Sequence, residues 1–254
     1  MRSMTVRNPY VFAVTLLAVF ILVGATAGGL GFISGLSVFA QVAIAEATLA
    51  VIGIVLLQSL GWLENAGYTR LIRVRDLPLF LLPFIIAFLS LSNGIVVTVP
   101  IQIGTFALLA LLIGFTEETF FRGLMLTGLL PRGINKAIII SSILFAAPHL
   151  LNVLAGLWNP LFTIADTFAA FGIGMTFAAL RVRTGSIWPL IGLHALIDFC
   201  ALLALGSLNI TAQSTESLAA TVFVGILLTG YGLFLLSRKS TNPDNPGDYR
   251  SGSA

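Results

Sequence analysis

Apolar residues occur in long runs along the chain, separated by short polar or glycine-containing segments. A helix needs about 20 mostly apolar residues to cross a bilayer, and eight runs reach or approach that length. The runs cover residues 10–32, 38–60, 77–93, 102–130, 134–154, 160–182, 186–206 and 217–237. The pattern predicts an all-α, polytopic membrane protein with about eight transmembrane helices.

The composition agrees with this fold class. Hydrophobic residues make up 57% of the chain and charged residues only 9%, with a mean hydropathy of +1.03, which lies outside the range of soluble domains. The first run is followed by the small residues of ATAGG but is longer than a signal-peptide core, so we expect a retained helix. No convincing internal repeat is found, and such repeats are typical of many transporters.

The hydropathy pattern also divides the chain into two parts. Residues 1–238 are expected to form a single transmembrane helical domain, with a motif-bearing core at 102–206. Residues 239–254 are polar and rich in proline and glycine, a composition that cannot bury enough apolar surface to fold. We therefore expect a disordered cytoplasmic tail.

The basic residues predict the orientation, because Lys and Arg collect in short cytoplasmic loops. All 13 fall on one side of the predicted helices: Arg2, Arg7, Arg70, Arg73, Arg75, Arg122, Arg132, Lys136, Arg181, Arg183, Arg238, Lys239 and Arg250. Both termini are therefore expected in the cytoplasm, in an integral multi-pass protein of the cell membrane of a prokaryote. Basic residues scattered in this way act as membrane anchors, which argues against nucleic acid as a partner.

Several ionisable residues fall inside the predicted spans: Glu46, Glu117, Glu118, Arg122, His149, Asp166, His194 and Asp198. Each costs about 2.5–3.5 kcal/mol to insert, so such residues indicate a functional site. Both histidines of the chain are among them. At about 1.5 Å per helical residue, Glu117, His149 and Asp198 lie at similar depth, about 20–22 Å from the inner ends of three different helices.

Spacing within each helix sorts these groups, since positions i and i+4 share a face. Three pairs have this spacing: Glu118 with Arg122, Phe145 with His149, and His194 with Asp198. Glu117 points about 100° away from Glu118. We expect Arg122 to neutralise Glu118, which leaves Glu117 free to face the histidines.

Structural alternatives exist for these residues. A Glu–Arg pair on one helix also occurs as a tolerated buried polar patch, and Phe145 is expected to be a packing residue. Glu46 and Asp166 are expected to satisfy each other or other polar groups. Cys200, the single cysteine, has no disulfide partner within the chain.

Three motifs in this part of the chain resemble those of a known family. EETFFRG contains Glu117, Glu118 and Arg122 in an EExxxR pattern, FAAPH runs from Phe145 to His149 as FxxxH, and HALID runs from His194 to Asp198 as HxxxN/D. Together, over residues 117–198, they resemble the CAAX protease and bacteriocin-processing (CPBP, Abi-like) family of intramembrane glutamic endopeptidases.

The resemblance implies a hydrolase with specific residue roles. Glu117 would activate a water that His149 helps to position, and His194 with Asp198 would stabilise the oxyanion. Glu118 and Arg122 would hold the geometry of the site. Well-known members of the family carry Asn at the last motif position, and an ionised Asp cannot donate a hydrogen bond. We therefore expect Asp198 to orient His194 and to stabilise its charged form instead.

The implied partners are a membrane-associated peptide or protein substrate and the lipid bilayer. No cofactor is expected, because HExxH is missing and zinc ligands would have to come from three separate helices, although zinc remains an alternative. Two other functions stay open. A membrane immunity or regulatory protein has no need of a complete set of catalytic motifs, and a proton-coupled transporter would use the same groups as a relay.

Overall fold

The computed structural model describes residues 7–154, 159–208 and 215–237. Over these ranges the chain is helical without strands, and eight helical segments are long and apolar enough to cross a membrane. They are Pro9–Ile33, Val38–Leu60, Val74–Ser92, Pro100–Arg132, Ile134–Leu154, Pro160–Thr184, Trp188–Leu205 and Glu216–Ser237. The predicted all-α, eight-span fold is confirmed, with boundaries within a few residues of those expected.

Some predictions fall outside the described residues. The tail 239–254 and the terminal basic residues Arg2, Arg238, Lys239 and Arg250 lie there. The cytoplasmic placement of both termini and the division into domain and tail therefore stay predictions.

Five of the spans are built mainly from single long helices: α1 (Pro9–Ile33), α2 (Val38–Leu60), α8 (Pro160–Thr184), α9 (Trp188–Leu205) and α10 (Thr215–Ser237). Their ends follow local rules. The side chain of Asn8 caps α1 by accepting from the backbone N–H of Tyr10 at 3.2 Å, and Asn159 caps α8 by accepting from Phe162 at 2.8 Å. These bonds satisfy backbone donors that a helix start leaves without partners.

The other three spans change helical geometry along their length. The third consists of η1 (Val74–Phe80), α3 (Leu81–Ala87) and η2 (Leu89–Asn93). The fourth consists of α4 (Pro100–Glu118), η3 (Thr119–Met125), α5 (Leu126–Leu129) and η4 (Leu130–Arg132), and the fifth of α6 (Ile134–Ala146), η5 (Ala147–Leu150) and α7 (Leu151–Leu154). Pro78 lies inside η1 and removes a backbone donor there, which is consistent with the interrupted third span.

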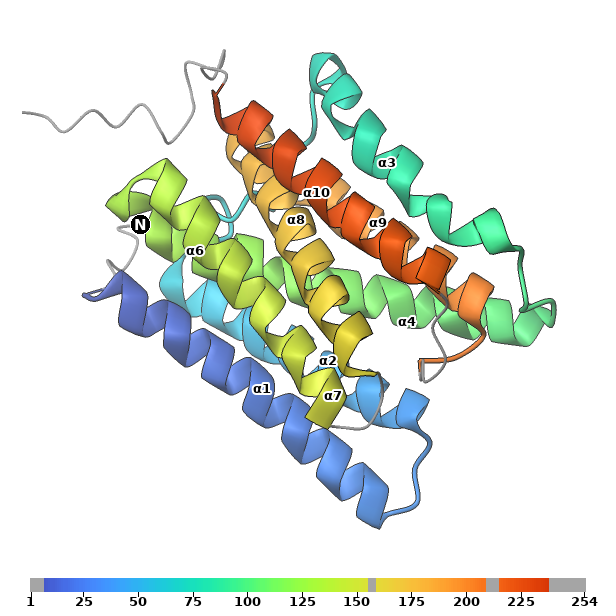
Figure 1. The fold of residues 1–254 in the computed structure, drawn as a ribbon. Coiled ribbons are helices and arrows are strands. Elements are labelled where there is room, and N and C mark those ends of the chain that lie inside the picture. The colour runs from blue at the N-terminus through green and yellow to red at the C-terminus, as the bar shows by residue number, and fades with distance from the viewer. Residues whose placement is uncertain (1–6, 155–158, 209–214, 238–254) are drawn as a thin grey trace, which may run out of the picture.

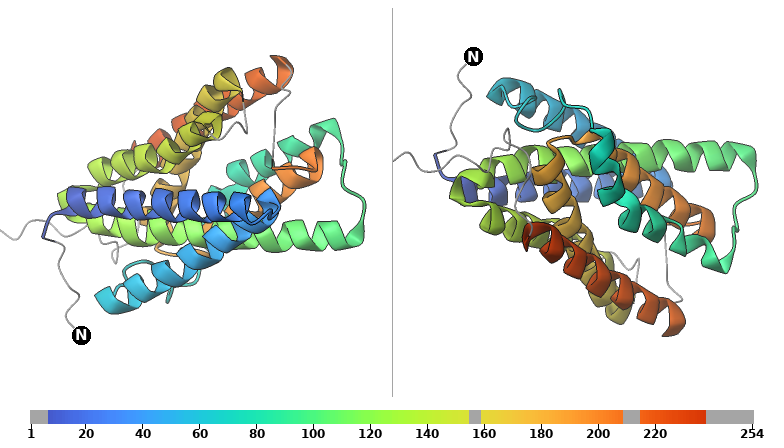
Figure 2. Two further views of the ribbon diagram at one scale, coloured as in Figure 1. Left: turned by 90° about the horizontal axis from the view of Figure 1, so that it is seen from below. Right: turned by 90° about the horizontal axis from the view of Figure 1, so that it is seen from above.

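Helix pairing places the second half of the fourth span, which carries the motif, in the interior of the bundle. In Figure 1, α1 runs beside α2 on one side, and α8 lies between α6 and α10 on the other. The helix α4 packs against α9 and also contacts α2. In both views of Figure 2, the N-terminal end of α4 reaches past the neighbouring helices.

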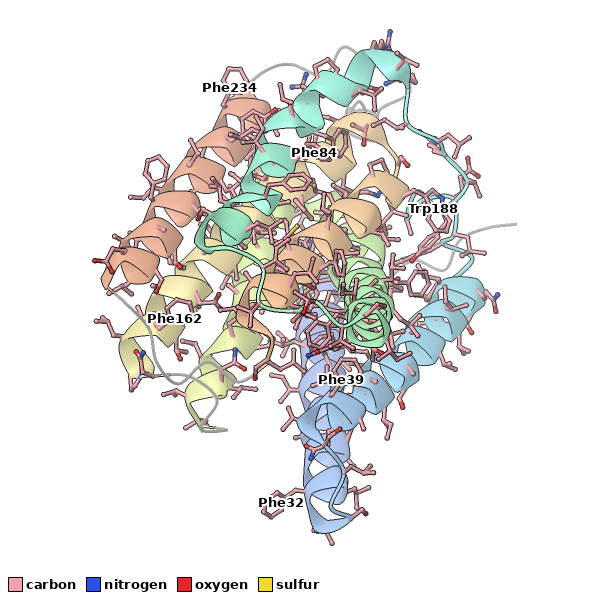
Figure 3. All side chains as sticks on the ribbon, turned by 90° about the vertical axis from the view of Figure 1, so that its right-hand side faces the viewer. Phe32, Phe39, Phe84, Phe162, Trp188 and Phe234 are labelled. Atoms are coloured by element: carbon pink, nitrogen blue, oxygen red, sulfur yellow. The ribbon has the colours of Figure 1, made fainter. Side chains whose placement is uncertain are left out.

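Large apolar side chains cover the outside of the bundle. Phe32, Phe84 and Phe234 are 82%, 48% and 45% exposed, and Figure 3 shows them on the periphery of the helices. A soluble protein rarely exposes apolar surface this extensively. The arrangement matches a helical bundle surrounded by lipid.

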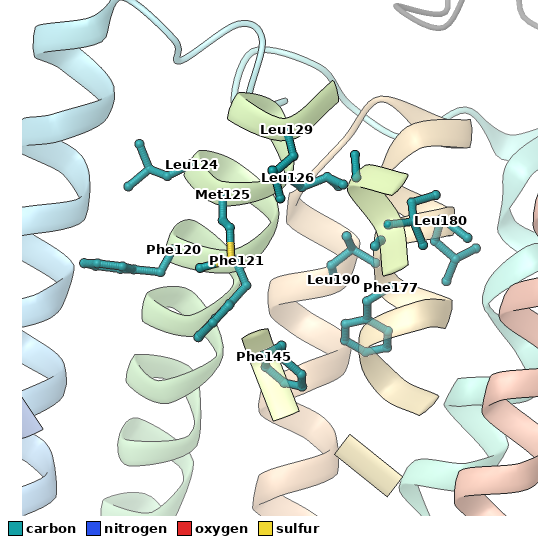
Figure 4. Packing of buried hydrophobic residues seen from close by; sticks show 14 of the residues in the cluster. Phe120, Phe121, Leu124, Met125, Leu126, Leu129, Phe145, Phe177, Leu180 and Leu190 are labelled. Atoms are coloured by element: carbon teal, nitrogen blue, oxygen red, sulfur yellow. The ribbon is translucent and has the colours of Figure 1, made fainter. Parts of the chain in front are cut away.

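The main core forms around the fourth span. Phe120, Phe121 and Met125 of this helix belong to one buried cluster with Phe145 and Phe177. Figure 4 shows Phe120 on the side of the helix that faces away from Phe145 and Phe177. All five side chains are almost completely buried. The aromatic packing fixes the rotation of the helix that carries EETFFRG, and therefore the direction of its charged side chains.

Gly114 permits the close approach of α4 and α9. A Cβ atom at this position would lie 2.9 Å from both the backbone nitrogen of Ala195 and the carbonyl oxygen of Ile191. These are backbone atoms that cannot rotate away. The contact lies one turn from Glu118 and beside His194, so it sets the distance between the two helices that carry them.

Gly114→Ala is expected to force α4 and α9 apart and to lower the free energy of unfolding by about 1–3 kcal/mol, as overpacking does. Thermal unfolding in detergent measures this change. Gly104→Ala on the same helix is the matched control, because a Cβ there meets nothing within 4 Å. Alanine favours helix over glycine, so the control is expected to be at least as stable as wild type, and equal stability of both variants would contradict the packing role of Gly114.

Candidate active site

The helix that carries EETFFRG changes geometry at this motif. α4 ends at Glu118, and the next turn and a half, Thr119–Met125, is a π-helix whose seven residues are all buried. Short π segments inside α-helices often occur at functional sites. Nothing in the residue pattern predicted this change, which alters the positions of the side chains that follow Glu118.

Glu118 and Arg122 form a buried ion pair. Arg122 Nη1 donates to Glu118 Oε1 at 2.8 Å, and the two side chains are 1% and 0% exposed. The guanidinium carbon of Arg122 lies 4.0 Å from the ring centroid of Phe145 and 5.4 Å from that of Phe177. The predicted pair is therefore present, and the aromatic faces provide a further favourable contact for its cation.

The same oxygen of Glu118 also contacts His194. His194 Nδ1 lies 2.8 Å from Glu118 Oε1, so Glu118 joins α4 to α9 as well as pairing with Arg122. His194 Nε2 lies 3.6 Å from Glu117 Oε2 and 3.7 Å from Asp198 Oδ2. The His194 ring thus has one nitrogen in a short contact and the other facing two carboxylates at longer distance.

The expectation that Glu118 pairs with Arg122 while Glu117 alone faces the histidines holds only in part. Glu117 does face a histidine, as predicted, but Glu118 does so too and at the shorter distance. Asp198 Oδ2 lies within ion-pair distance of His194 Nε2, while the short contact of the ring is with Glu118, so the expectation that Asp198 orients His194 stays a prediction. Spacing along one helix could not show this, since the Glu118–His194 contact joins two helices.

His149 lies at a change of helix type in the fifth span. α6 ends at Ala146, and η5, a short 3-10 segment with Pro148 in its first turn, carries the histidine. His149 Nδ1 lies 2.7 Å from Asp166 Oδ2 on α8. Asp166 was expected only to satisfy a polar group, and the structure shows that this group belongs to the FxxxH motif.

Phe145 links the two histidines, beyond its expected packing role. Its ring centroid lies 6.0 Å from that of His149 and 5.9 Å from that of His194, the latter in an edge-to-face arrangement. The face of the same ring also contacts Arg122, so Phe145 touches the buried ion pair as well as His149. The residues of all three motifs therefore lie in one connected cluster.

Glu46 approaches this cluster from α2. Thr116 Oγ1 donates to the backbone carbonyl of Glu46 at 3.0 Å, which places the residue beside the turn that carries Glu117. The side chain is 8% exposed and interacts electrostatically with Glu117 and Asp198. Glu46 and Asp166 therefore do not pair with each other, and Glu46 adds a further carboxyl group to the region.

The connection between α2 and the third span closes one side of the cluster. Tyr68 OH is hydrogen-bonded to Thr119 Oγ1, and the Trp188 indole donates to the backbone carbonyl of Tyr68 at 2.9 Å. Burial raises the pKa of Tyr68 to about 12, so its hydroxyl stays protonated at physiological pH. Tyr68 thus joins this connection to the residue that follows Glu118.

No metal-binding arrangement was found in the part of the chain that the structure describes. Over these residues, no group of three or more His, Cys, Asp or Glu side chains is placed to hold a metal ion. The expectation that the site works without a cofactor stays a prediction, which metal analysis of the protein can test.

Comparison with known proteins agrees with the motifs. Residues 99–200 match the family model described as type II CAAX prenyl endopeptidase, Rce1-like. No curated protein matches the chain. The matched segment runs from the start of α4 into α9 and includes every residue of the cluster except Glu46. The resemblance to the CAAX protease and bacteriocin-processing family is confirmed over this segment.

Proposed function

Because residues 99–200 match the family model described as type II CAAX prenyl endopeptidase, Rce1-like, we propose that this membrane protein hydrolyses peptide bonds with a glutamate-activated water. Its substrate would be a membrane-associated or lipidated peptide or protein. The observation that carries the proposal is the contact of Glu117 and Glu118 with His194 inside an apolar bundle, with His149 joined to His194 through the ring of Phe145. No step of the proposed mechanism involves a metal.

Glu117 is the residue best placed to act as the base. Glu118 is held by both Arg122 and His194 at 2.8 Å, whereas the nearest ionic contact of Glu117 is at 3.6 Å. Its side chain is 19% exposed, against 0% for Glu118. Glu117 is therefore accessible to water and has a carboxylate oxygen that is not held at short distance. A group that takes a proton from water needs both properties.

His194 is the donor that would stabilise the oxyanion. Its Nδ1 is engaged by Glu118, so a proton on Nε2 points between Glu117 and Asp198 without a short acceptor. A hydrogen-bond donor fixed in a water-poor site stabilises a developing negative charge more strongly than the same donor in water. Asp198 need not donate in this scheme, because its negative charge supports a protonated His194 from 3.7 Å.

His149 would hold the attacking water from the other side. It interacts electrostatically with Glu117, and Asp166 occupies its Nδ1, which leaves Nε2 for the water. Water attack on the scissile carbonyl would pass one proton to Glu117, which then returns it to the leaving amine. The products are a new carboxyl terminus and a new amino terminus.

The test compares wild type with Glu117→Ala and His149→Ala in the native host, with new peptide termini at the membrane mapped by mass spectrometry. Termini that are present in wild type and missing in both variants are expected. Glu64→Ala, which changes an exposed glutamate outside the spans, is the matched control and is expected to leave them unchanged. If no terminus depends on Glu117 while the protein keeps its biological effect, the immunity or regulatory alternative replaces the proposal.

A further inference from the structure

Each of the two histidines is paired with a carboxylate through the same ring atom. His194 Nδ1 lies 2.8 Å from Glu118 Oε1, and His149 Nδ1 lies 2.7 Å from Asp166 Oδ2. Glu118 belongs to the EExxxR motif, but Asp166 belongs to none of the three motifs. The similarity of the two contacts raises the question of what Asp166 does for His149.

We infer that Asp166 is a positioning residue that fixes the ring orientation and tautomer of His149, so that His149 Nε2 faces the water beside Glu117. This role rests on the proposed function. It goes beyond the motif residues, because it adds a fourth helix, α8, to the elements that build the site.

The surroundings of Asp166 support a specific role. The residue lies inside the span Pro160–Thr184, where a carboxylate is costly and needs a partner. Among the described residues, His149 is its one ion-pair partner, and the two side chains are 22% and 28% exposed. The pair therefore joins the fifth and sixth spans through polar groups that are only partly exposed.

The backbone around His149 explains why the ring needs such a partner. His149 lies in the 3-10 segment Ala147–Leu150 after Pro148, so a regular α-helix does not fix its direction. The ring centroids of Phe145 and His149 lie 6.0 Å apart. This contact restricts the position of the imidazole but not its tautomer. A carboxylate that accepts from Nδ1–H selects the tautomer in which Nε2 carries the lone pair.

The chemical consequence concerns the attacking water. With Nδ1–H held by Asp166, His149 Nε2 accepts a hydrogen bond from the water while Glu117 takes the other proton. If the proton were on Nε2 instead, the ring would donate a hydrogen bond to the water. This would make the water a weaker nucleophile and oppose its activation by Glu117. In serine proteases, replacing the aspartate beside the catalytic histidine by asparagine permits the wrong tautomer and strongly reduces kcat.

The test uses the fact that the chain has only two histidines. Labelling with 15N-histidine gives two imidazole rings in the NMR spectrum, which His149→Gln assigns. In Asp166→Asn, the His149 nitrogen shifts are expected to move towards an average of both tautomers, while those of His194 stay in place as an internal control. Asp76→Asn, which removes a carboxylate paired with Arg73, is the matched control and is expected to move neither ring.

Activity provides the second readout. Asp166→Asn is expected to lower kcat by about 10- to 100-fold, the range found for carboxylates that orient metal-bound histidines, with KM little changed. Unchanged His149 shifts, equal movement of both rings, or wild-type kcat would each overturn the role of Asp166. If the wild-type protein cleaves no peptide, the proposed function fails, while the NMR spectra still decide whether Asp166 fixes the His149 ring.

Discussion

Replacing Glu117 by glutamine is expected to lower kcat for peptide hydrolysis by about 10²- to 10⁴-fold, the usual contribution of a general base. Glutamine keeps the size and most hydrogen bonds of the side chain but cannot take a proton. Glu117 is partly exposed and makes no short ion pair with any residue that the structure describes, so the fold should not depend on its charge. Cleavage of a membrane-associated peptide by purified protein measures the effect, and thermal unfolding should be unchanged.

Two controls separate a base from a general need for negative charge. Asp198→Asn neutralises a carboxylate at nearly the same distance from His194 and is expected to keep substantial activity, because Asn can also donate to an oxyanion. Glu64→Gln changes a glutamate outside the candidate spans and should have no effect. An Asp198→Asn protein as inactive as Glu117→Gln would show that Asp198 has a role beyond supporting His194.

Replacing Arg122 by methionine is expected to lower the free energy of unfolding by about 3–5 kcal/mol, the usual cost of leaving one partner of a buried ion pair alone. The guanidinium is 1% exposed and the Glu118 carboxylate 0% exposed, so water cannot replace the lost partner. Denaturant or thermal unfolding in detergent measures the stability.

The double variant Glu118→Met with Arg122→Met is the critical comparison for this pair. Removing both charges leaves neither member of the ion pair alone, although His194 Nδ1 loses its contact with Glu118, so the double variant should be more stable than Arg122→Met alone. Arg132→Met, at an exposed position, is the matched control and should change stability little. If Arg122→Met were as stable as wild type, the pair would not hold the site together.

Hydropathy alone predicted the spans because the bilayer fixes the length of an apolar helix. It located eight segments close to those observed, including the interrupted third span at 77–93. It also predicted the Glu118–Arg122 pair, since both residues lie on one helix and their spacing decides whether they meet.

The contacts between helices were not predictable in the same way. Glu118 meets His194 and Asp166 meets His149 only because each pair of helices has a particular rotation, and hydropathy does not encode rotation. The π segment Thr119–Met125 changes that rotation within a single span. For these reasons Asp166 was assigned no function from sequence, although its unfavourable position inside a span indicated that it had a partner.

The decisive measurement is cleavage of a peptide spanning a junction mapped in the host, by purified protein in liposomes after treatment with a metal chelator. If Glu117 activates the water, wild type cleaves the junction after chelation and Glu117→Gln does not. Cleavage by Glu117→Gln at the wild-type rate, or wild-type activity that chelation abolishes and zinc restores, would contradict a glutamate-based mechanism.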